Sequence, residues 1–232
     1  MLEIKNLDAG YDKLQILRNV SIKLKKGDLT IIIGPNGSGK STTVKSVFGL
    51  TKRFKGAVLF EGKNLNKLKT HERVRLGIGY VPQGRLVFDT LTVEENLEMG
   101  GFGLPTEEVE EKKQEMLKLF PLLETKLDQK ASFLSGGQQQ MLSIARALMR
   151  TPKLLLLDEP SLGLDPKTQA HIFQIVKRIN TEGVTVMMVE QNAHQALAIC
   201  KKAFVIENGR VALSGGPSLA KKKSVQKLYL GG

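Results

Sequence analysis

Residues 34–41 read GPNGSGKS, and this stretch decides the fold. It matches the glycine-rich phosphate-binding loop and lies between the apolar run LTIII (29–33) and the helix-like TTVKSVFGL (42–50). In such a loop, inward-turned backbone N–H groups bind an anion, and the next helix N-terminus adds positive potential. Lys40 would reach the β- and γ-phosphates, and the Ser41 hydroxyl would ligate Mg²⁺. The predicted nucleotide-binding residues are Gly34, Pro35, Asn36, Gly37, Ser38, Gly39, Lys40, Ser41 and Thr42.

A second motif, LLLLDEP (154–160), ends a predicted buried strand in two carboxylates. Asp158 is suited to hold the Mg²⁺ shell. Glu159, one residue further, is suited to orient and deprotonate a water that attacks the γ-phosphate. Taken alone, the pair fits equally well a set of helix-entry carboxylates before a turn at Pro160. Beside a phosphate-binding loop, the catalytic interpretation is favoured.

The third motif is LSGGQ (134–138). Ser135 and Gln138 form a capping-box pattern, so this is a predicted helix start. Gly136 and Gly137 in the first turn weaken helix propensity by about 1 kcal/mol each. They also permit close backbone approach beside a serine hydroxyl and an uncrowded helix N-terminus. LSGGQ is therefore a second candidate anion-binding element.

The composition indicates a soluble intracellular protein. The chain has 232 residues, 41% hydrophobic and 25% charged, and its one cysteine, Cys200, fits a reducing compartment. No apolar stretch approaches the roughly 20 residues of a membrane span. The formal charge of +12 is spread over scattered lysines, and aromatic residues make up only 5%. We therefore expect no nucleic-acid partner, although basic side chains near anionic lipid remain an option.

The pattern along the chain predicts an α/β fold. The first sixty residues are strand-rich, residues 85–150 carry helical periodicity and capping boxes, and strands then alternate with helices up to an Asn208-Gly209 hairpin turn. These features predict a parallel-sheet core, an N-terminal antiparallel β part and an inserted helical subdomain. The expected division of the single domain 1–232 is a core of 1–84 and 151–232, with 85–150 as the helical subdomain.

With LSGGQ between a phosphate-binding loop and LLLLDEP, the chain resembles the nucleotide-binding subunit of ATP-binding cassette (ABC) transporters, over essentially its whole length. The resemblance implies a P-loop NTPase fold and an ATPase that binds ATP with Mg²⁺. It also implies that two subunits meet head to tail, so that LSGGQ of one covers the ATP of the other. Tyr11 matches the adenine-stacking aromatic, although it also fits an ordinary packed tyrosine. Gln83 matches the glutamine that joins the Mg²⁺ and water site to the helical subdomain. Asp165 matches the dimer-interface aspartate, or a plain helix N-cap.

A narrower resemblance rests on VPQGRLVFDTLTVEENLEMGG (81–101), DEPSLGL (158–164), VEQN (189–192) and LYLGG (228–232). These stretches are similar to the second ATPase subunit of branched-chain amino acid importers and their urea and short-amide relatives. Membrane permease subunits and a location on the cytoplasmic face of the cell membrane are thereby implied. The second ATPase would be another copy of this chain or a sister protein.

The strand VTVMMV (184–189) leads into Glu190, Gln191, Asn192 and, further on, His194. Most members of the family have a histidine two residues beyond the last valine, where it contacts the γ-phosphate. Counting from Val189, that position is Gln191. Glutamine donates one hydrogen bond but cannot become cationic. We therefore predict that Gln191 is the γ-phosphate contact and that His194 is an ordinary helix residue.

Two other classes of protein carry the same motifs. Soluble ABC proteins of DNA maintenance have a long coiled-coil insertion between phosphate loop and LSGGQ, and those of translation usually have two cassettes; this chain has neither feature. A nucleotide-gated scaffold is disfavoured because Lys40, Ser41, Asp158 and Glu159 are all present. The sequence therefore favours a transport ATPase.

Overall fold

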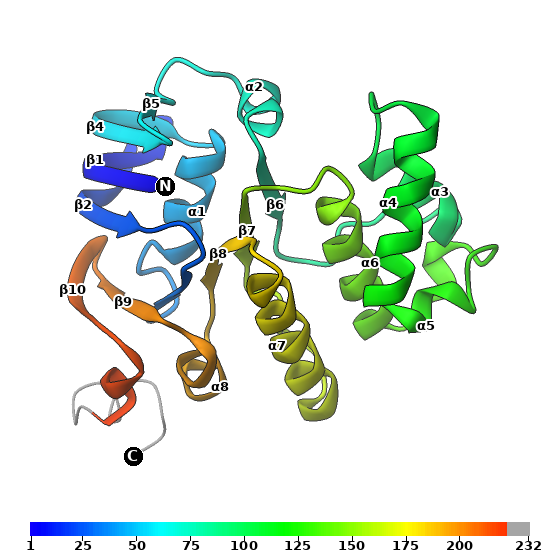
Figure 1. The fold of residues 1–232 in the computed structure, drawn as a ribbon. Helices are drawn as coiled ribbons and strands as arrows, with labels where there is room; N and C mark the ends of the chain where they lie inside the picture. Colours follow the sequence, from blue (N-terminus) through cyan, green and yellow to red (C-terminus); the bar gives the residue numbers. More distant parts are fainter. Residues whose placement is uncertain (222–232) are drawn as a thin grey trace.

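The computed structural model describes residues 1–221, and these form two sheets with helices around them (Figure 1). The ending LYLGG (228–232), on which the narrower resemblance partly rests, lies outside the described residues. One sheet has four strands in the order β2-β1-β4-β5, and the other has six in the order β10-β9-β3-β8-β7-β6. The predicted combination of an antiparallel β part and a parallel-sheet core is confirmed.

The four-stranded sheet is antiparallel and comes from the N-terminal quarter of the chain. Its strands are β1 (Leu2–Tyr11), β2 (Leu14–Leu24), β4 (Lys52–Phe60) and β5 (Lys63–Asn64). Side chains such as Ile22 and Leu24 are buried while their neighbours are exposed, the alternation of a sheet with one solvated face. The sheet carries Tyr11 at the end of its first strand.

The six-stranded sheet supplies the edge on which the candidate site is built. Strands β3 (Leu29–Ile33), β7 (Leu154–Asp158) and β8 (Thr185–Val189) are buried at every position. They run parallel with β6 (Ile78–Val81) and β9 (Lys202–Glu207), and only β10 (Arg210–Gly215) is antiparallel. Because β3, β8, β7 and β6 share one direction, the loops after them emerge at one carboxyl edge.

Helices cover the parallel sheet and extend away from it on one side (Figure 1). Four helices lie against the sheets: α1 (Lys40–Phe48), α2 (Thr70–Arg75), α7 (Pro166–Thr181) and α8 (Ala193–Ile199). The stretch between β6 and β7 is helical, with α3 (Val93–Gly100), α4 (Thr106–Leu119), α5 (Pro121–Glu124) and α6 (Gly136–Leu148). Two short 3₁₀ helices span Ala131–Phe133 and Pro217–Lys221.

The helix starts follow the predicted caps, whereas some other boundaries differ. Thr92 with Glu95 and Ser135 with Gln138 form complete capping boxes. Helix α4 ends at Leu119, two residues before Pro121, as the proline predicts, and Pro121 then begins the separate short helix α5, where its missing N–H is tolerated in the first turn. Strand β6 and helix α2 were not predicted. Within residues 1–221, no helix is both long enough and apolar enough to cross a bilayer.

Candidate nucleotide-binding and active site

The phosphate-binding loop lies between β3 and α1, as the motif requires. Gly34 is packed so tightly that a Cβ there would lie 2.2 Å from the Ile206 carbonyl oxygen, so only glycine fits. The loop is fixed from the neighbouring hairpin, because the Gly209 N–H donates to the Ser38 carbonyl at 2.9 Å. A rigid backbone can therefore present its N–H groups to an anion without reorganisation.

Lys40 lies inside this loop and is almost fully buried, with 4% of its surface exposed. Its ammonium donates to the carbonyl oxygens of Gly34 (2.9 Å) and Pro35 (3.1 Å). It also forms an ion pair at 3.6 Å with Glu159 Oε1. A phosphate that entered the loop would compete with the Glu159 carboxylate for this ammonium.

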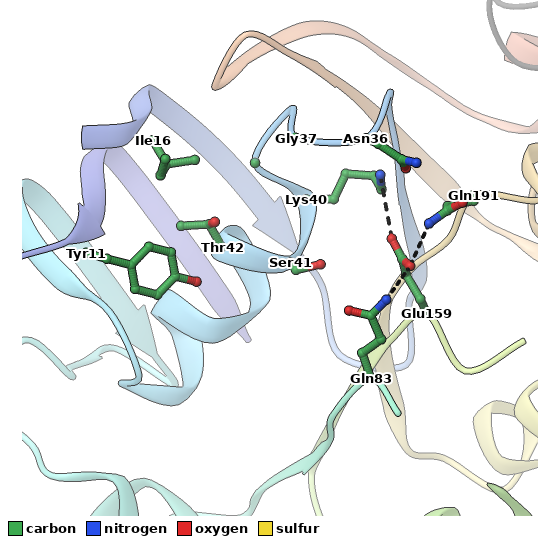
Figure 2. A pocket seen from close by; sticks show the side chains of 11 residues that line it. Tyr11, Ile16, Asn36, Gly37, Lys40, Ser41, Thr42, Gln83, Glu159 and Gln191 are labelled. Atoms are coloured by element: carbon green, nitrogen blue, oxygen red, sulfur yellow. Dashed lines mark hydrogen bonds and ion pairs between the residues drawn. The ribbon is translucent and has the colours of Figure 1, made fainter. Parts of the chain in front are cut away.

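Glu159 is held from three directions (Figure 2). While Oε1 pairs with Lys40, Oε2 accepts from the amide nitrogens of Gln83 (3.1 Å) and Gln191 (2.7 Å). The backbone of Glu159 has φ of 52°, a left-handed conformation uncommon for glutamate, and its N–H donates to the Val189 carbonyl at 3.0 Å. Such strain persists where the surroundings over-determine a conformation, and it clusters at functional sites.

The predicted residues meet in a cleft of about 380 Å³. Tyr11 and Ile16 line one end, and Glu159, Gln83 and Gln191 line the other (Figure 2). Ile16 was not predicted, because a single apolar residue within a β-strand is typical of core packing. Between the two ends lie Asn36, Gly37, Gly39, Lys40, Ser41 and Thr42.

Some predicted nucleotide contacts lie beside the cleft rather than on its wall. Gly34 lies behind the lining residues, as the acceptor for Lys40. Pro35 and Ser38 border a neighbouring hollow of about 280 Å³ with Asn208, and Ser38 is buried. Their side chains do not line the cleft, so these residues could contact a nucleotide there only through their backbone atoms.

The Asp158 carboxylate is fully buried beside the cleft and fits a cation. Its Oδ2 accepts from the Tyr80 hydroxyl at 3.3 Å, whereas Oδ1 is buried with no hydrogen-bond partner among residues 1–221. A buried carboxylate oxygen without a partner is costly unless something else binds it. Oxygen ligands from a carboxylate and the Ser41 hydroxyl are those that Mg²⁺ prefers. The donor set therefore fits Mg²⁺.

Tyr80 is a site residue that the sequence did not single out. It comes from β6, and its ring packs on that of Phe48 at a centroid distance of 4.8 Å. Burial raises the pKa of Tyr80, and the adjacent Asp158 adds to this rise, so the phenol stays a hydrogen-bond donor. Only the register of β6 against β7, which aligns Tyr80 with Leu156, brings the two side chains together.

The signature LSGGQ (134–138) lies outside the cleft. The Ser135 hydroxyl accepts from the Gln138 N–H at 3.4 Å, and the Gln138 side chain accepts from the Ser135 N–H at 3.0 Å. A Cβ on Gly136 would lie 2.1 Å from a guanidinium nitrogen of Arg85. Arg85 in turn donates to the Gly163 carbonyl at 2.6 Å, so one unpredicted side chain links the signature to the loop before Asp165.

Asp165 also lies outside the cleft and caps α7. Its carboxylate accepts from the N–H groups of Lys167 and Thr168 at 3.1 Å and from the Thr168 hydroxyl at 2.5 Å. The Thr168 hydroxyl and N–H lower the pKa of Asp165, because they stabilise its ionised form. The N-cap interpretation is confirmed, and a role at a dimer interface stays a prediction.

Gln191 and His194, the two residues considered for the γ-phosphate contact, lie in different surroundings after strand β8. Gln191 reaches Glu159 and lines the cleft. His194 lies in α8 with an exposed side chain and is not a lining residue. The location of His194 on the outside of its helix is confirmed. Of the two residues, only Gln191 lines the cleft, and its contact with a γ-phosphate stays a prediction.

Comparisons with known proteins identify the family of the chain. The ABC transporter family model matches residues 17–162. Over 233 aligned residues, the chain is 46% identical to the high-affinity branched-chain amino acid transport ATP-binding protein BraG of Pseudomonas aeruginosa, covering all of both chains. It is 41% identical to the probable branched-chain amino acid transport ATP-binding protein LivF of Archaeoglobus fulgidus, covering 100% of this chain and 99% of that one.

A solved structure supports both fold and activity. A dimeric ATP-binding cassette in a post-hydrolysis state with ADP and Pi is 31% identical, covers 94% of this chain and 99% of its own, and gives a TM-score of 0.83. Glu159, Lys40 and the phosphate-binding loop thus lie within a fold that hydrolyses ATP in a relative. The chain belongs to the ABC transporter family, as an ATPase subunit.

Proposed function

We propose that this ATPase powers the uptake of branched-chain amino acids through separate membrane subunits. The observation that carries the proposal is full-length identity of 46% to a branched-chain amino acid transport ATP-binding protein. The solute itself has no site on this chain in the proposal, because the membrane subunits would carry it. Urea or a short amide would be transported by the same arrangement, and an uptake assay distinguishes these solutes from the branched-chain amino acids.

In the proposed reaction, Glu159 is the general base. Its carboxylate orients a water in line with the γ-phosphate and accepts a proton as the oxygen attacks phosphorus. Gln191 and Gln83, which donate to the same oxygen, fix the direction in which Glu159 points. Gln191 also donates one hydrogen bond to the γ-phosphate. Because a glutamine cannot shuttle a proton, Glu159 carries the proton transfer alone.

Lys40 and the loop backbone hold the β- and γ-phosphates. The Lys40 ammonium pairs with Glu159 at 3.6 Å. We infer that bound phosphate takes over the Lys40 ammonium, which frees the Glu159 carboxylate to act on water. Binding of ATP and readiness of the base are thereby linked through one buried ion pair.

Mg²⁺ would be held by the Ser41 hydroxyl, by Asp158 and by Gln83, together with phosphate oxygens. When bound it supplies charge neutralisation at the β- and γ-phosphates. The buried, unpartnered Oδ1 of Asp158 supports this assignment. Tyr80 holds the other oxygen and so limits the carboxylate to one orientation.

The signature and Asp165 act on a second ATPase subunit. Ser135, Gly136, Gly137 and Gln138 lie outside this chain's own cleft and form the capped N-terminus of α6, an arrangement suited to an anion brought by a partner. Tyr11, 39% exposed at the far end of the cleft, stacks on adenine. The partner is a second copy or a sister ATPase.

The membrane subunits dock on a groove between the core and the helical subdomain, at the cytoplasmic face of the membrane. A pocket of about 160 Å³ lies there, lined by Phe48, Val74 and Tyr80 on one side and by Gly100, Ala147 and Arg150 on the other. Phe102 is 79% exposed, and its carbonyl accepts from Arg150 at 2.7 Å, so this apolar side chain stands beside the pocket. We infer that residues 85–150 move together on ATP binding and carry the docked helix with them.

The uptake assay uses a strain that lacks the native chain and expresses variants with the native permeases. Wild type should restore uptake of labelled leucine, isoleucine and valine, and Lys40→Ala should not. Phe102→Asp should lower uptake at least about tenfold, because burying an unpaired carboxylate in the docking groove is costly. Its free-subunit ATPase activity should stay within about twofold of wild type, because Phe102 is far from the chemistry.

The matched control is Leu122→Asp, since Leu122 is an exposed apolar residue of α5 outside the groove. It should leave uptake unchanged. Restoration of urea or amide uptake with no effect on the three amino acids would refute the proposed solute. Equal uptake by the Phe102 and Leu122 variants would refute the docking groove.

A further inference from the structure

Glu190 is a buried carboxylate that neither the predicted site nor the proposed chemistry uses. It follows strand β8 and comes directly before Gln191, and only 1% of its surface is exposed. Its backbone N–H donates to the Ile32 carbonyl at 3.1 Å, which fixes it next to the start of the phosphate-binding loop. An acidic side chain this deep in a protein is rare unless it is fully hydrogen-bonded.

Three donors converge on the Glu190 carboxylate. Its Oε1 accepts from the Ser161 N–H at 3.0 Å. Its Oε2 accepts from the Ser161 hydroxyl at 2.9 Å and from the Gln191 N–H at 3.1 Å. Ser161 stands two residues after Glu159. One side chain therefore ties the turn that carries the base to the turn that carries the γ-phosphate contact.

This tie is needed because the two turns come from different strands. The turn that carries Glu159 follows β7, and the turn that carries Gln191 follows β8. The two strands pair as far as Asp158 with Val189. Beyond that pair, the Glu159 N–H donates to Val189, and the Gln191 amide donates to the Glu159 carboxylate. The Glu159 backbone has its strained φ of 52° at this point. The carboxylate of Glu190 accepts from the Ser161 N–H, two residues after the strained residue, and from the Gln191 N–H in the other turn.

We propose that Glu190 is a positioning residue for ATP hydrolysis, which sets the separation and orientation of Glu159 and Gln191 by bonding the backbone of both turns. It contacts neither nucleotide nor water. It acts through the two residues that do, and it leaves the phosphate-binding loop and Tyr11 untouched. Loss of the tie therefore lowers the rate of the chemical step more than the affinity for ATP.

The chemistry of the tie makes glutamine an informative replacement. Both carboxylate oxygens face a backbone N–H, one from Ser161 and one from Gln191. An amide has one oxygen and one NH₂ group, so either orientation of the introduced amide would aim a donor at a backbone donor. Glu190→Gln keeps the size of the side chain but breaks one of the two tethers.

The test measures kcat, equilibrium ATP affinity and the thermal midpoint of the purified chain. Glu190→Gln should lower kcat at least about tenfold, since small displacements of catalytic groups cost up to about a hundredfold. ATP affinity should stay within about twofold. Ser161→Ala removes only the hydroxyl donor and should lower kcat about threefold. The double variant should lose less than the product of the two single losses, because both act on one contact.

The matched control is Thr185→Val at the opposite end of strand β8. Thr185 is fully buried and its hydroxyl accepts from the Gly27 N–H at 3.0 Å, so this variant removes a buried hydrogen bond far from the cleft. If Glu190 only stabilised the fold, Glu190→Gln and Thr185→Val would lose the same fraction of kcat for the same fall in thermal midpoint. The proposal instead requires a kcat loss beyond that of the control.

If Glu190→Gln keeps kcat within twofold of wild type, the proposal is wrong. The same holds if its ATP affinity falls in parallel with kcat. Should Glu190→Gln fail to fold, Ser161→Ala decides. A kcat loss with unchanged ATP affinity and thermal midpoint supports the tie, and an unchanged kcat overturns it.

Discussion

The cleft and the signature differ in how complete they are within one chain. In the cleft, Glu159 is 6% exposed and its two oxygens already bind Lys40, Gln83 and Gln191. At the signature, the side chains of Ser135 and Gln138 bond the backbone N–H groups of each other across the first turn of α6, and neither residue lines the cleft. One region is a preorganised site, and the other, under the proposed function, is half of a site.

This difference explains why the two motifs have different sequences. The cleft uses a nest of backbone N–H groups and buried charge, which hold without a partner. The signature uses glycines and a helix N-terminus, whose N–H groups can meet an anion brought by a partner. Arg85 lies beside Gly136 and donates to the Gly163 carbonyl, so it links the signature to the loop before Asp165 rather than to the cleft. Variants in each region should therefore fail at different steps.

The largest effect is expected in the cleft. Lys40→Ala removes the buried ammonium that bonds the loop carbonyls and pairs with Glu159. ATP binding and turnover should both fall, turnover by at least about a hundredfold. Equilibrium binding of ATP and phosphate release measure the two. Lys45→Ala, in the same helix but outside the cleft lining, is the control and should bind ATP as wild type does.

A signature variant should separate binding from turnover. Gly136→Ala adds a methyl that displaces the flexible end of Arg85, so the chain should still fold. ATP affinity of the single subunit should stay within about twofold, while turnover should fall about tenfold because the helix N-terminus is obstructed for the partner. The exposed Lys130→Ala serves as control. An equal loss of binding and turnover would contradict the division into two regions.

The buried carboxylate Glu190 and the exposed carboxylate Asp165, one near each region, should respond oppositely to pH. Burial raises the pKa of Glu190 to about 7 from 4.5, with its hydrogen bonds opposing the rise. The folded state then binds a proton more tightly than the unfolded state. The stability this confers is present below about pH 4.5 and is lost as pH rises through 7, by about 3 kcal/mol. Asp165, with a lowered pKa, should confer stability above its ordinary pKa that is lost as pH falls.

Urea unfolding of wild type against Glu190→Gln and Asp165→Asn measures both trends. From pH 5 to pH 7.5, the difference in unfolding free energy between wild type and Glu190→Gln should fall. From pH 5 to pH 3, the difference between wild type and Asp165→Asn should fall as well. If both differences change in the same direction with rising pH, the contrast between the buried and the exposed carboxylate is wrong.

The smallest effect is expected at His194. Its side chain is exposed on α8 and does not line the cleft, so His194→Ala should leave turnover within about twofold. Steady-state phosphate release measures this, with Gln191→Ala beside it as the variant that should lose activity. A loss of a hundredfold or more in His194→Ala, the scale of a general base, would mean that the γ-phosphate contact has been assigned to the wrong residue.

The sequence predicted the elements that carry local signals. The phosphate-binding loop, the strand ending in Asp158 and Glu159, and both capping boxes each lie within a few consecutive residues. Counting from the end of one strand was enough to predict that Gln191, rather than His194, lies at the cleft. These parts follow from short-range rules of loop chemistry, periodicity and capping.

The contacts between distant segments could not be predicted. Tyr80 meets Asp158, Ser161 meets Glu190 and Arg85 meets Gly163, pairs separated by 78, 29 and 78 positions in the chain. Each pair depends on strand order and register, which decide which loops emerge side by side. In the sequence, Tyr80 is an ordinary strand residue and Glu190 follows a strand, and only the sheet brings Tyr80 to Asp158 and Glu190 to Ser161.

The most direct test of the account is Glu159→Gln in a single-turnover experiment. The variant keeps the size of the side chain but replaces the carboxylate, the proposed base, with an amide. We predict ATP affinity within about threefold of wild type, a subunit pair that persists with ATP bound, and phosphate release slowed by at least about a hundredfold. Phosphate release at the wild-type rate, with ATP bound normally, would contradict the assignment of Glu159 as the base.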